Sequence, residues 1–298
     1  MTERMGSTSS PRIGLIGGSG LGDVLQQQLK DCTEVAVDTP FGRPSGKILT
    51  GIFAGREIAF INRHGDGHRF SPSTVPYAAN IFALKKLGVT AVIAGCAVGS
   101  LKKSIRPKDI VIVSQVIDKT FKRQNTFFDG IAAVHCELAH PYCGRLRNVL
   151  LDSAAGVRTK VHSEAVYVCM EGPQFSTRAE SLIHQEWGGE LIGMTAMPEA
   201  KLAREAQMCF ALVALISDYD CWQKKNEQKD AQMLLQEIIG NLNEATANTI
   251  ELIKAVLQSG QTLCDDNCPC RKSLQLAVWT KPESIAPKYN DILKVLRQ

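Results

Sequence analysis

The chain has 298 residues, of which 44% are hydrophobic and 21% are charged, and its 34 Lys and Arg against 30 Asp and Glu give a net charge of +4. This length suits one large α/β domain or two small ones. So small and dispersed a charge excludes a basic stripe that binds nucleic acid. Because no apolar run approaches about 18 residues, no membrane-spanning helix is predicted.

The two ends of the chain differ from its middle. Residues 1–11 are rich in Ser and Thr and lack the apolar core of a signal peptide, so we expect a flexible amino terminus and a cytoplasmic protein, with the nucleus as a further location. Residues 12–257 have the regular pattern of one domain. Residues 258–298 begin with a Cys-rich stretch, and we expect a tail that packs on the domain or on a neighbouring subunit.

Near-continuous apolar segments alternate with amphipathic segments along residues 12–257. This alternation is typical of a single α/β domain in which helices flank a central, mixed or mostly parallel twisted sheet. Thr177 and Glu180 have the spacing of a capping box, and Pro198 suits the first turn of another helix. The predicted strands cover residues 13–16, 57–62, 89–95, 109–117, 165–170, 190–193 and 210–217, and the predicted helices cover residues 75–87, 145–155, 178–187, 199–208 and 231–257.

The first predicted strand ends in Gly17-Gly18-Ser19-Gly20, which offers unhindered backbone N–H groups and a hydroxyl to an anion the size of phosphate. A tight turn that needs glycine explains the segment equally well. The segment is not a dinucleotide fingerprint, because Asp23 stands where a third glycine is required.

Other polar or small residues also follow predicted strands. Arg63-His64 could donate to an anion, and Cys96-Ala97 leaves backbone donors open to a ligand. Asp218 and Asp220 close an apolar strand, where burial would raise the pKa of a carboxyl group and make it a proton donor. Solvated loops are the alternative for each segment alone. Together they predict one crevice at the carboxyl edge of the sheet, where phosphate attacks while an acid protonates a leaving group.

Five ordered motifs resemble S-methyl-5'-thioadenosine phosphorylases of the trimeric purine nucleoside phosphorylase family. The likeness runs from Ile13 to Leu257 and includes the uncommon segment Glu171-Gly-Pro-Gln-Phe-Ser-Thr-Arg-Ala-Glu180. It implies a homotrimer that converts S-methyl-5'-thioadenosine and phosphate to adenine and 5-methylthio-ribose 1-phosphate, with no cofactor. The motifs involved are Gly17-Gly18-Ser19-Gly20, Arg63-His64-Gly65, the segment 171–180, Met194-Thr195 and Ser217-Asp-Tyr-Asp220.

The same resemblance implies a role for each matching residue. Phosphate would be bound by Ser19, Arg63, His64, Cys96, Ala97 and Thr195. The nucleoside would be bound by Phe175, Ser176, Met194 and, from the adjacent subunit, His135. Asp218 and Asp220 would recognise N7 and the 6-amino group of adenine, with Asp218 as the acid.

Three departures from the family pattern bear on the substrate. Gly193 stands where adenosine-type members generally carry Asn, Cys96 replaces a usual Thr, and the segment 223–230 is polar. Adenosine or 6-oxopurine nucleosides are therefore alternative substrates, and a nucleoside-binding relative that has lost catalysis is the alternative from another class. An NAD-dependent oxidoreductase is disfavoured by the missing glycine fingerprint.

The cysteines are predicted to be reduced thiols. Cys264, Cys268 and Cys270 supply three sulfur ligands with no nearby His, fewer than a zinc site needs, so we expect no metal. Cys268-Pro-Cys270 resembles a tail of microbial family members in which such pairs can form disulfides.

Overall fold

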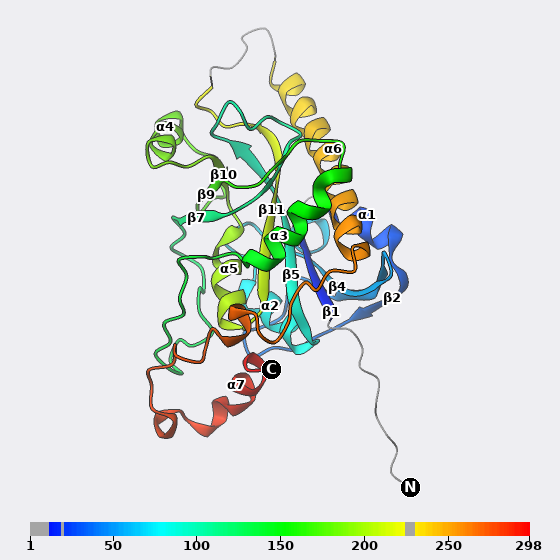
Figure 1. The fold of residues 1–298 in the computed structure, drawn as a ribbon. Helices are drawn as coiled ribbons and strands as arrows, with labels where there is room; N and C mark the ends of the chain where they lie inside the picture. The colour runs from blue at the N-terminus through cyan, green and yellow to red at the C-terminus, as the bar shows by residue number, and fades with distance from the viewer. Residues whose placement is uncertain (1–11, 19–20, 224–229) are drawn as a thin grey trace.

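The computed structural model describes residues 12–18, 21–223 and 230–298. An eleven-stranded mixed sheet forms its centre (Figure 1), in the main order β2-β3-β4-β1-β5-β10-β9-β7, with β11 paired to β5 and β6, and β8 paired to β6. The single α/β domain with a mixed sheet is thus confirmed. The strands are β1 (Arg12–Gly17), β2 (Lys30–Val35), β3 (Ile48–Phe53), β4 (Arg56–Asn62), β5 (Val89–Ser100), β6 (Ile110–Ile112), β7 (Gln115–Asp118), β8 (Val161–His162), β9 (Val166–Cys169), β10 (Leu191–Gly193) and β11 (Cys209–Tyr219).

Helices cover both faces of the sheet because its central strands are apolar on both sides. Along β11, Phe210 and Leu212 enter the core beneath α2, α5 and α7, whereas Ala211 and Val213 enter the core beneath α1, α3 and α6. This alternation follows from the two-residue period of a strand. The helices are α1 (Leu21–Gln28), α2 (Tyr77–Lys86), α3 (Gly144–Asp152), α4 (Arg178–Glu186), α5 (Ala196–Glu205), α6 (Ala231–Gln258) and α7 (Asn290–Leu296).

The strand β5 changes neighbours along its length. On one side, β1 pairs with it as far as Ala94, and β10 pairs with it from Gly99 onward. The backbone of residues 95–98 lies between these two pairings. On the other side, β11 runs parallel to almost the whole of β5. The sheet therefore leaves a short stretch of β5 backbone open on one side, where β1 and β4 end.

Both predicted helix starts are confirmed. Thr177 accepts the Glu180 N–H, and the Glu180 carboxylate accepts the Thr177 N–H, completing the capping box of α4. In α5 the backbone of Met197 is extended, so regular helix begins at Pro198.

The predicted strand over residues 109–117 is wrong in one respect, because it is two strands. The chain leaves the side of β11 after β6, where Val113 donates to Leu212, and turns toward β9, where Ser114 and Gln115 donate to Ala165. The apolar run continues through this change of partner, so sequence pattern alone does not show it. The hairpin of β2 and β3 and the helix α1 were also not predicted. In β2 the sequence pattern fails because the strand is largely exposed and polar.

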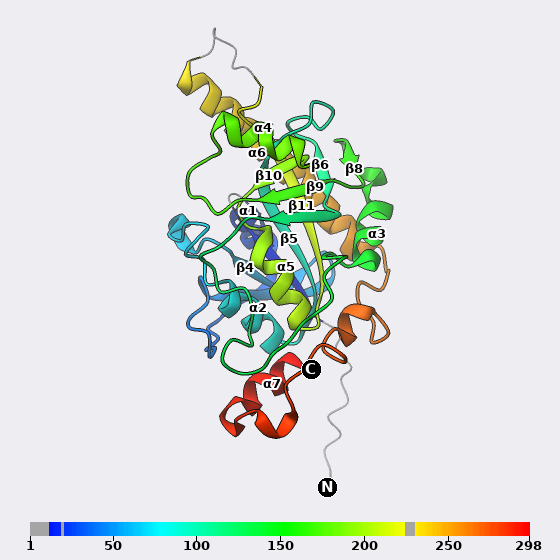
Figure 2. The ribbon, with the colours of Figure 1, turned by 90° about the vertical axis from the view of Figure 1, so that its left-hand side faces the viewer.

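The tail packs against both cores of the domain (Figure 2). Leu293 and Leu296 of α7 join the core that includes α2, and the two elements lie side by side at the foot of the molecule. The short 3₁₀ helix η3 (Pro269–Lys272) precedes α7 in the tail. At η3, Cys268 and Cys270 join the core beneath α3 and α6. None of the described helices is long and apolar enough to cross a membrane.

Candidate active site

Arg63 follows β4 and is almost completely buried, next to the end of β1 at Gly17 and the middle of β5 at Gly95. Its Nε and Nη2 donate to the two carboxylate oxygens of Glu199 at 2.6 and 3.0 Å, and its Nη1 donates to the Gly95 carbonyl at 2.9 Å. Burial opposes its charge, but Glu199 raises the pKa of Arg63, so it stays charged. The bidentate pair fixes the plane of the guanidinium and leaves further N–H groups for an anion.

The glycine turn after β1 lies against this arginine. The Arg63 N–H donates to the Gly17 carbonyl at 2.8 Å, and a Cβ added at Gly18 would lie 3.3 Å from Arg63 Nη1. A side chain at position 18 would therefore crowd the guanidinium. Ser19, predicted to bind phosphate, lies outside the described residues.

His64 presents an acceptor rather than the predicted additional donor. Its Nδ1 lies 2.8 Å from the Phe70 carbonyl, which can only accept, so Nδ1 carries the proton. Burial, and the neighbouring charges of Arg63 and His68, lower the pKa of His64 to about 4. Near pH 7 the ring is therefore neutral and Nε2 has a lone pair, which suits the hydroxyl of a monohydrogen phosphate.

Cys96, Ala97 and Thr195 complete the same area. Cys96 and Ala97 belong to the open stretch of β5, and the side chain of Ala97 is exposed. Burial raises the pKa of the Cys96 thiol to about 12, so no thiolate repels an anion there. Thr195 is buried directly before α5, three residues before the regular helix that begins at Pro198.

Asp218 and Asp220 lie farther along the sheet, at the end of β11. Asp218 is paired with Gly99 of β5 and accepts the Ser217 hydroxyl at 2.6 Å. Burial raises the pKa of Asp218 to about 6, against the Ser217 hydrogen bond and with the help of Asp220. Asp220 Oδ2 is buried without a hydrogen-bond partner among the described residues. The pair thus offers one carboxyl group able to carry a proton and one unfilled acceptor.

The anion-binding residues around Arg63 and the carboxyl group of Asp218 lie along the same strand, β5. Arg63 contacts β5 at Gly95, and Asp218 is level with Gly99, four residues farther on. At roughly 3.3 Å per residue the two levels lie about 13 Å apart. A sugar and a purine can span this separation, with an anion at one end and the acid at the other.

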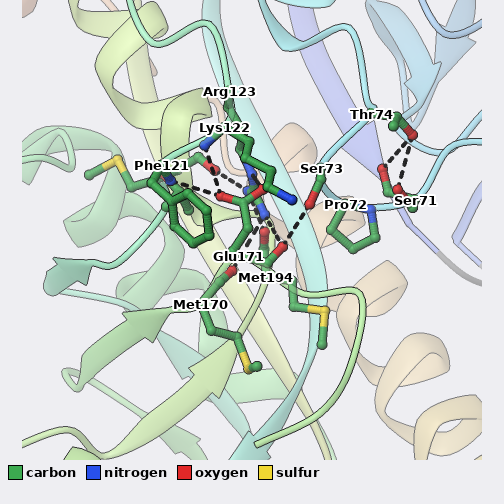
Figure 3. Close-up of polar contacts among 12 residues, drawn as sticks. Ser71, Pro72, Ser73, Thr74, Phe121, Lys122, Arg123, Met170, Glu171 and Met194 are labelled. Atoms are coloured by element: carbon green, nitrogen blue, oxygen red, sulfur yellow. Dashed lines mark hydrogen bonds and ion pairs between the residues drawn. The ribbon is translucent and has the colours of Figure 1, made fainter.

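A buried ion pair that sequence reasoning missed holds the backbone that follows β9 and β10 (Figure 3). Arg123 Nε lies 3.2 Å from Glu171, and its terminal nitrogens donate to the carbonyls of Glu171, Met194 and Met197. Burial opposes ionisation of Glu171, but hydrogen bonds, including one from the Phe121 N–H, and the charge of Arg123 lower its pKa to about 2. The pair therefore positions Met194 through its main chain.

Comparison with known proteins assigns this arrangement to a family. The model of the phosphorylase superfamily matches residues 12–258. The chain belongs to the phosphorylase superfamily. The S-methyl-5'-thioadenosine phosphorylase of Cereibacter sphaeroides is 44% identical over 276 residues, which cover 93% of both chains.

Two solved phosphorylase structures extend the likeness to the fold. A methylthioadenosine phosphorylase from an antarctic soil metagenomic library superposes with a TM-score of 0.86 at 38% identity, covering 97% of this chain and 99% of that chain. A mutant adenosine/methylthioadenosine phosphorylase of Schistosoma mansoni in complex with methylthioadenosine gives 0.80 at 32% identity, covering 90% and 99%. The resemblance inferred from the motifs is therefore confirmed.

Tyr167 explains why this phosphorylase has glycine at position 193. A Cβ at Gly193 would lie 2.0 Å from the Tyr167 hydroxyl, so no larger residue fits beside this tyrosine. The Thr195 N–H donates to the same hydroxyl at 3.3 Å. Tyr167, which sequence reasoning did not select, thus brings a polar hydroxyl to the place where the family resemblance implies an Asn side chain.

The remaining residues predicted to bind the nucleoside differ in how far they are buried and in what they contact within this chain. Ser176 is partly buried, with its hydroxyl 3.6 Å from the Met170 sulfur, whereas Phe175 is 86% exposed. His135 donates its N–H to Ala277 and stacks edge-on against Trp279, both in the tail. Of the polar segment 223–230, residues 224–229 lie outside the described part of the chain.

Proposed function

We propose that the chain catalyses phosphorolysis of S-methyl-5'-thioadenosine, releasing adenine and 5-methylthio-ribose 1-phosphate. The observation that carries the proposal is the alignment along β5 of an anion-binding group around Arg63 with the carboxyl groups of Asp218 and Asp220. Phosphate is a co-substrate, and the reaction needs no organic cofactor and no metal among the reacting groups. The similarity to named methylthioadenosine phosphorylases supports the substrate.

The reaction requires opposite charges at its two ends. As the bond between C1' and N9 weakens, the sugar gains oxocarbenium character and the purine gains negative charge. Asp218 in its protonated form donates to N7, which neutralises the leaving group. A phosphate oxygen held beside Arg63 attacks C1' from the opposite face, and the new C–O bond replaces the C–N bond with inversion.

Asp220 supplies selectivity for a 6-aminopurine. Its buried Oδ2 has no described partner, and the 6-amino group of adenine donates a hydrogen bond that would fill it. A 6-oxopurine presents an acceptor there, which would leave two acceptors facing each other and the carboxylate unsatisfied. We therefore expect adenine nucleosides to be preferred over inosine.

A substrate panel tests the proposed function. Release of the free base, which is adenine from S-methyl-5'-thioadenosine and adenosine and hypoxanthine from inosine, is measured with and without phosphate. We expect release from S-methyl-5'-thioadenosine only when phosphate is present, and kcat/KM for inosine at least about 10²-fold lower. No phosphate-dependent base release from any of the three would overturn the proposal.

We further propose that the phosphorylase is a homotrimer in the cytoplasm. The exposed side chains of Phe121, Phe175 and Trp279 form apolar surface on the single chain, and burial against a neighbour would stabilise them. In that assembly His135 reaches the 5' group of the adjacent subunit's substrate. Light scattering after gel filtration should give three times the mass of the chain, and a monomeric active enzyme would contradict the assembly.

A further inference from the structure

Four buried cysteines from three distant parts of the chain meet beside the tail. Cys143 precedes α3, Cys209 begins β11, and Cys268 and Cys270 belong to the tail around η3. Their exposed fractions are 3%, 0%, 4% and 5%. Figure 2 shows the orange part of the tail below α3, and Cys268 and Cys270 of this tail belong to the core of the domain.

The four sulfur atoms have the mutual spacing of ligands around one ion. All lie within 4.8 Å of one another, with 3.4 Å between Cys209 and Cys268 and 3.7 Å between Cys143 and Cys268. A tetrahedral zinc ion with Zn–S bonds of about 2.3 Å places its sulfurs about 3.8 Å apart. Two disulfides would instead bring the sulfurs into bonded pairs at about 2.05 Å.

The surroundings of the four cysteines favour a bound cation over free thiols. The four side chains are enclosed in an apolar core with few polar partners, where four neutral thiols make only weak hydrogen bonds. A divalent cation would stabilise all four thiolates at once.

Four thiolates around one divalent zinc ion keep a net negative charge. Arg204 and the N-terminus of α3 lie where they would stabilise this charge. Arg204 Nη1 lies 3.7 Å from the Cys270 sulfur, and the same arginine donates to the His140 carbonyl just before Cys143. Cys143 also stands at the N-terminus of α3, where the helix dipole stabilises a thiolate. Outer contacts of this kind orient and tune metal ligands.

We propose that Cys143, Cys209, Cys268 and Cys270 bind one zinc ion that fastens the tail to the domain. Ligands from α3, β11 and the tail would be crosslinked through the metal, next to the ion pair of 2.6 Å between Arg145 and Asp265. Binding replaces the four S–H bonds with four Zn–S bonds and releases the protons to solvent. The earlier expectation of no metal counted only the tail cysteines, and Cys143 and Cys209 give no local sequence signal.

The metal content of the purified protein tests this proposal. The full chain, without an affinity tag and under reducing conditions, is analysed by elemental mass spectrometry, and we expect about one zinc ion per chain. X-ray absorption at the zinc edge should show a shell of sulfur at about 2.3 Å. Cobalt(II) exchanged into the site should give the intense visible bands of tetrahedral thiolate coordination.

Variants identify the ligands. Cys143→Ser and Cys268→Ser should each lose nearly all of the zinc and lower the melting temperature by several degrees. Cys264→Ser is the matched control, because Cys264 is a buried tail cysteine next to Cys209 but outside the four. It should retain zinc.

Other outcomes overturn the proposal. Protein that contains no metal, with all thiols titratable after denaturation, would show that the cluster is a core of free cysteines. A mass lower by two or four hydrogens in unreduced protein, with thiols missing in that titration, would show disulfides instead. Iron in place of zinc, or zinc retained by Cys143→Ser and Cys268→Ser, would also contradict it.

Discussion

In the proposed reaction the carboxyl group of Asp218 must be protonated to donate to N7, and its surroundings set the pH range in which it carries that proton. Burial raises its pKa to about 6, the Ser217 hydrogen bond opposes this rise, and Asp220 adds to it. The pH dependence of kcat/KM reports the free enzyme. We therefore expect kcat/KM for S-methyl-5'-thioadenosine to fall as pH rises above about 6, because the carboxyl loses its proton.

The variant Asp218→Asn tests this assignment. Asparagine can donate a hydrogen bond to N7 but cannot transfer a proton, so kcat/KM should fall by roughly 10²–10⁴-fold. The decline above pH 6 should disappear from the profile, while the melting temperature stays close to that of the parent. An unchanged rate, or an unchanged profile with a lower rate, would exclude Asp218 as the acid.

Gly193 and Tyr167 should behave as a coupled pair. The variant Gly193→Asn places a Cβ on the Tyr167 ring and hydroxyl, at 2.0 Å from the oxygen, and overpacking of this kind costs about 1–3 kcal/mol or more. Adding Tyr167→Leu removes the obstacle, so the double variant should regain stability relative to Gly193→Asn alone. Additive losses in thermal unfolding would show that the two sites are independent.

The loops between elements depend on the ion pair of Arg123 and Glu171. The variant Arg123→Met removes the charge that Glu171 faces and the donors to Met194 and Met197. Breaking a buried pair in this way costs about 3–5 kcal/mol. We expect a lower melting temperature and a higher KM for the nucleoside.

Lys122→Met is the matched control for this effect. Lys122 contacts Glu171 only through its backbone N–H, which the substitution keeps. Its melting temperature and KM should stay close to those of the parent. Equal losses in the two variants would show that the side chain of Arg123 has no special role.

The strands and helices of the domain were largely predictable because burial on two faces leaves long apolar runs. The hairpin of β2 and β3 was not predictable, since β2 is stabilised by pairing rather than by its own burial. At the site, Arg63 and Asp218 were found because polar residues end apolar strands. Glu199 and Arg123 were missed because each finds its partner only after folding, and Glu199 is one of several charged residues in α5, so it does not stand out in the sequence.

The tail forms part of the folded molecule rather than a loose extension. Leu296 of α7 is fully buried, whereas Leu276 in the same tail is 90% exposed. The variant Leu296→Ala should therefore lower the free energy of unfolding by about 2–5 kcal/mol. Leu276→Ala should leave it within about 0.5 kcal/mol in the isolated chain. Similar values for both variants in chemical denaturation would show that the tail does not stabilise the domain.

Phosphorus NMR of the products tests the proposed chemistry most directly. Protein is incubated with S-methyl-5'-thioadenosine and phosphate until the base is released, and the sugar product is followed alongside adenine. We predict one equivalent of a sugar 1-phosphate for every adenine formed, since phosphate at Arg63 attacks as Asp218 protonates the purine. Adenine accompanied by free sugar and unchanged phosphate would mean hydrolysis and would contradict the account.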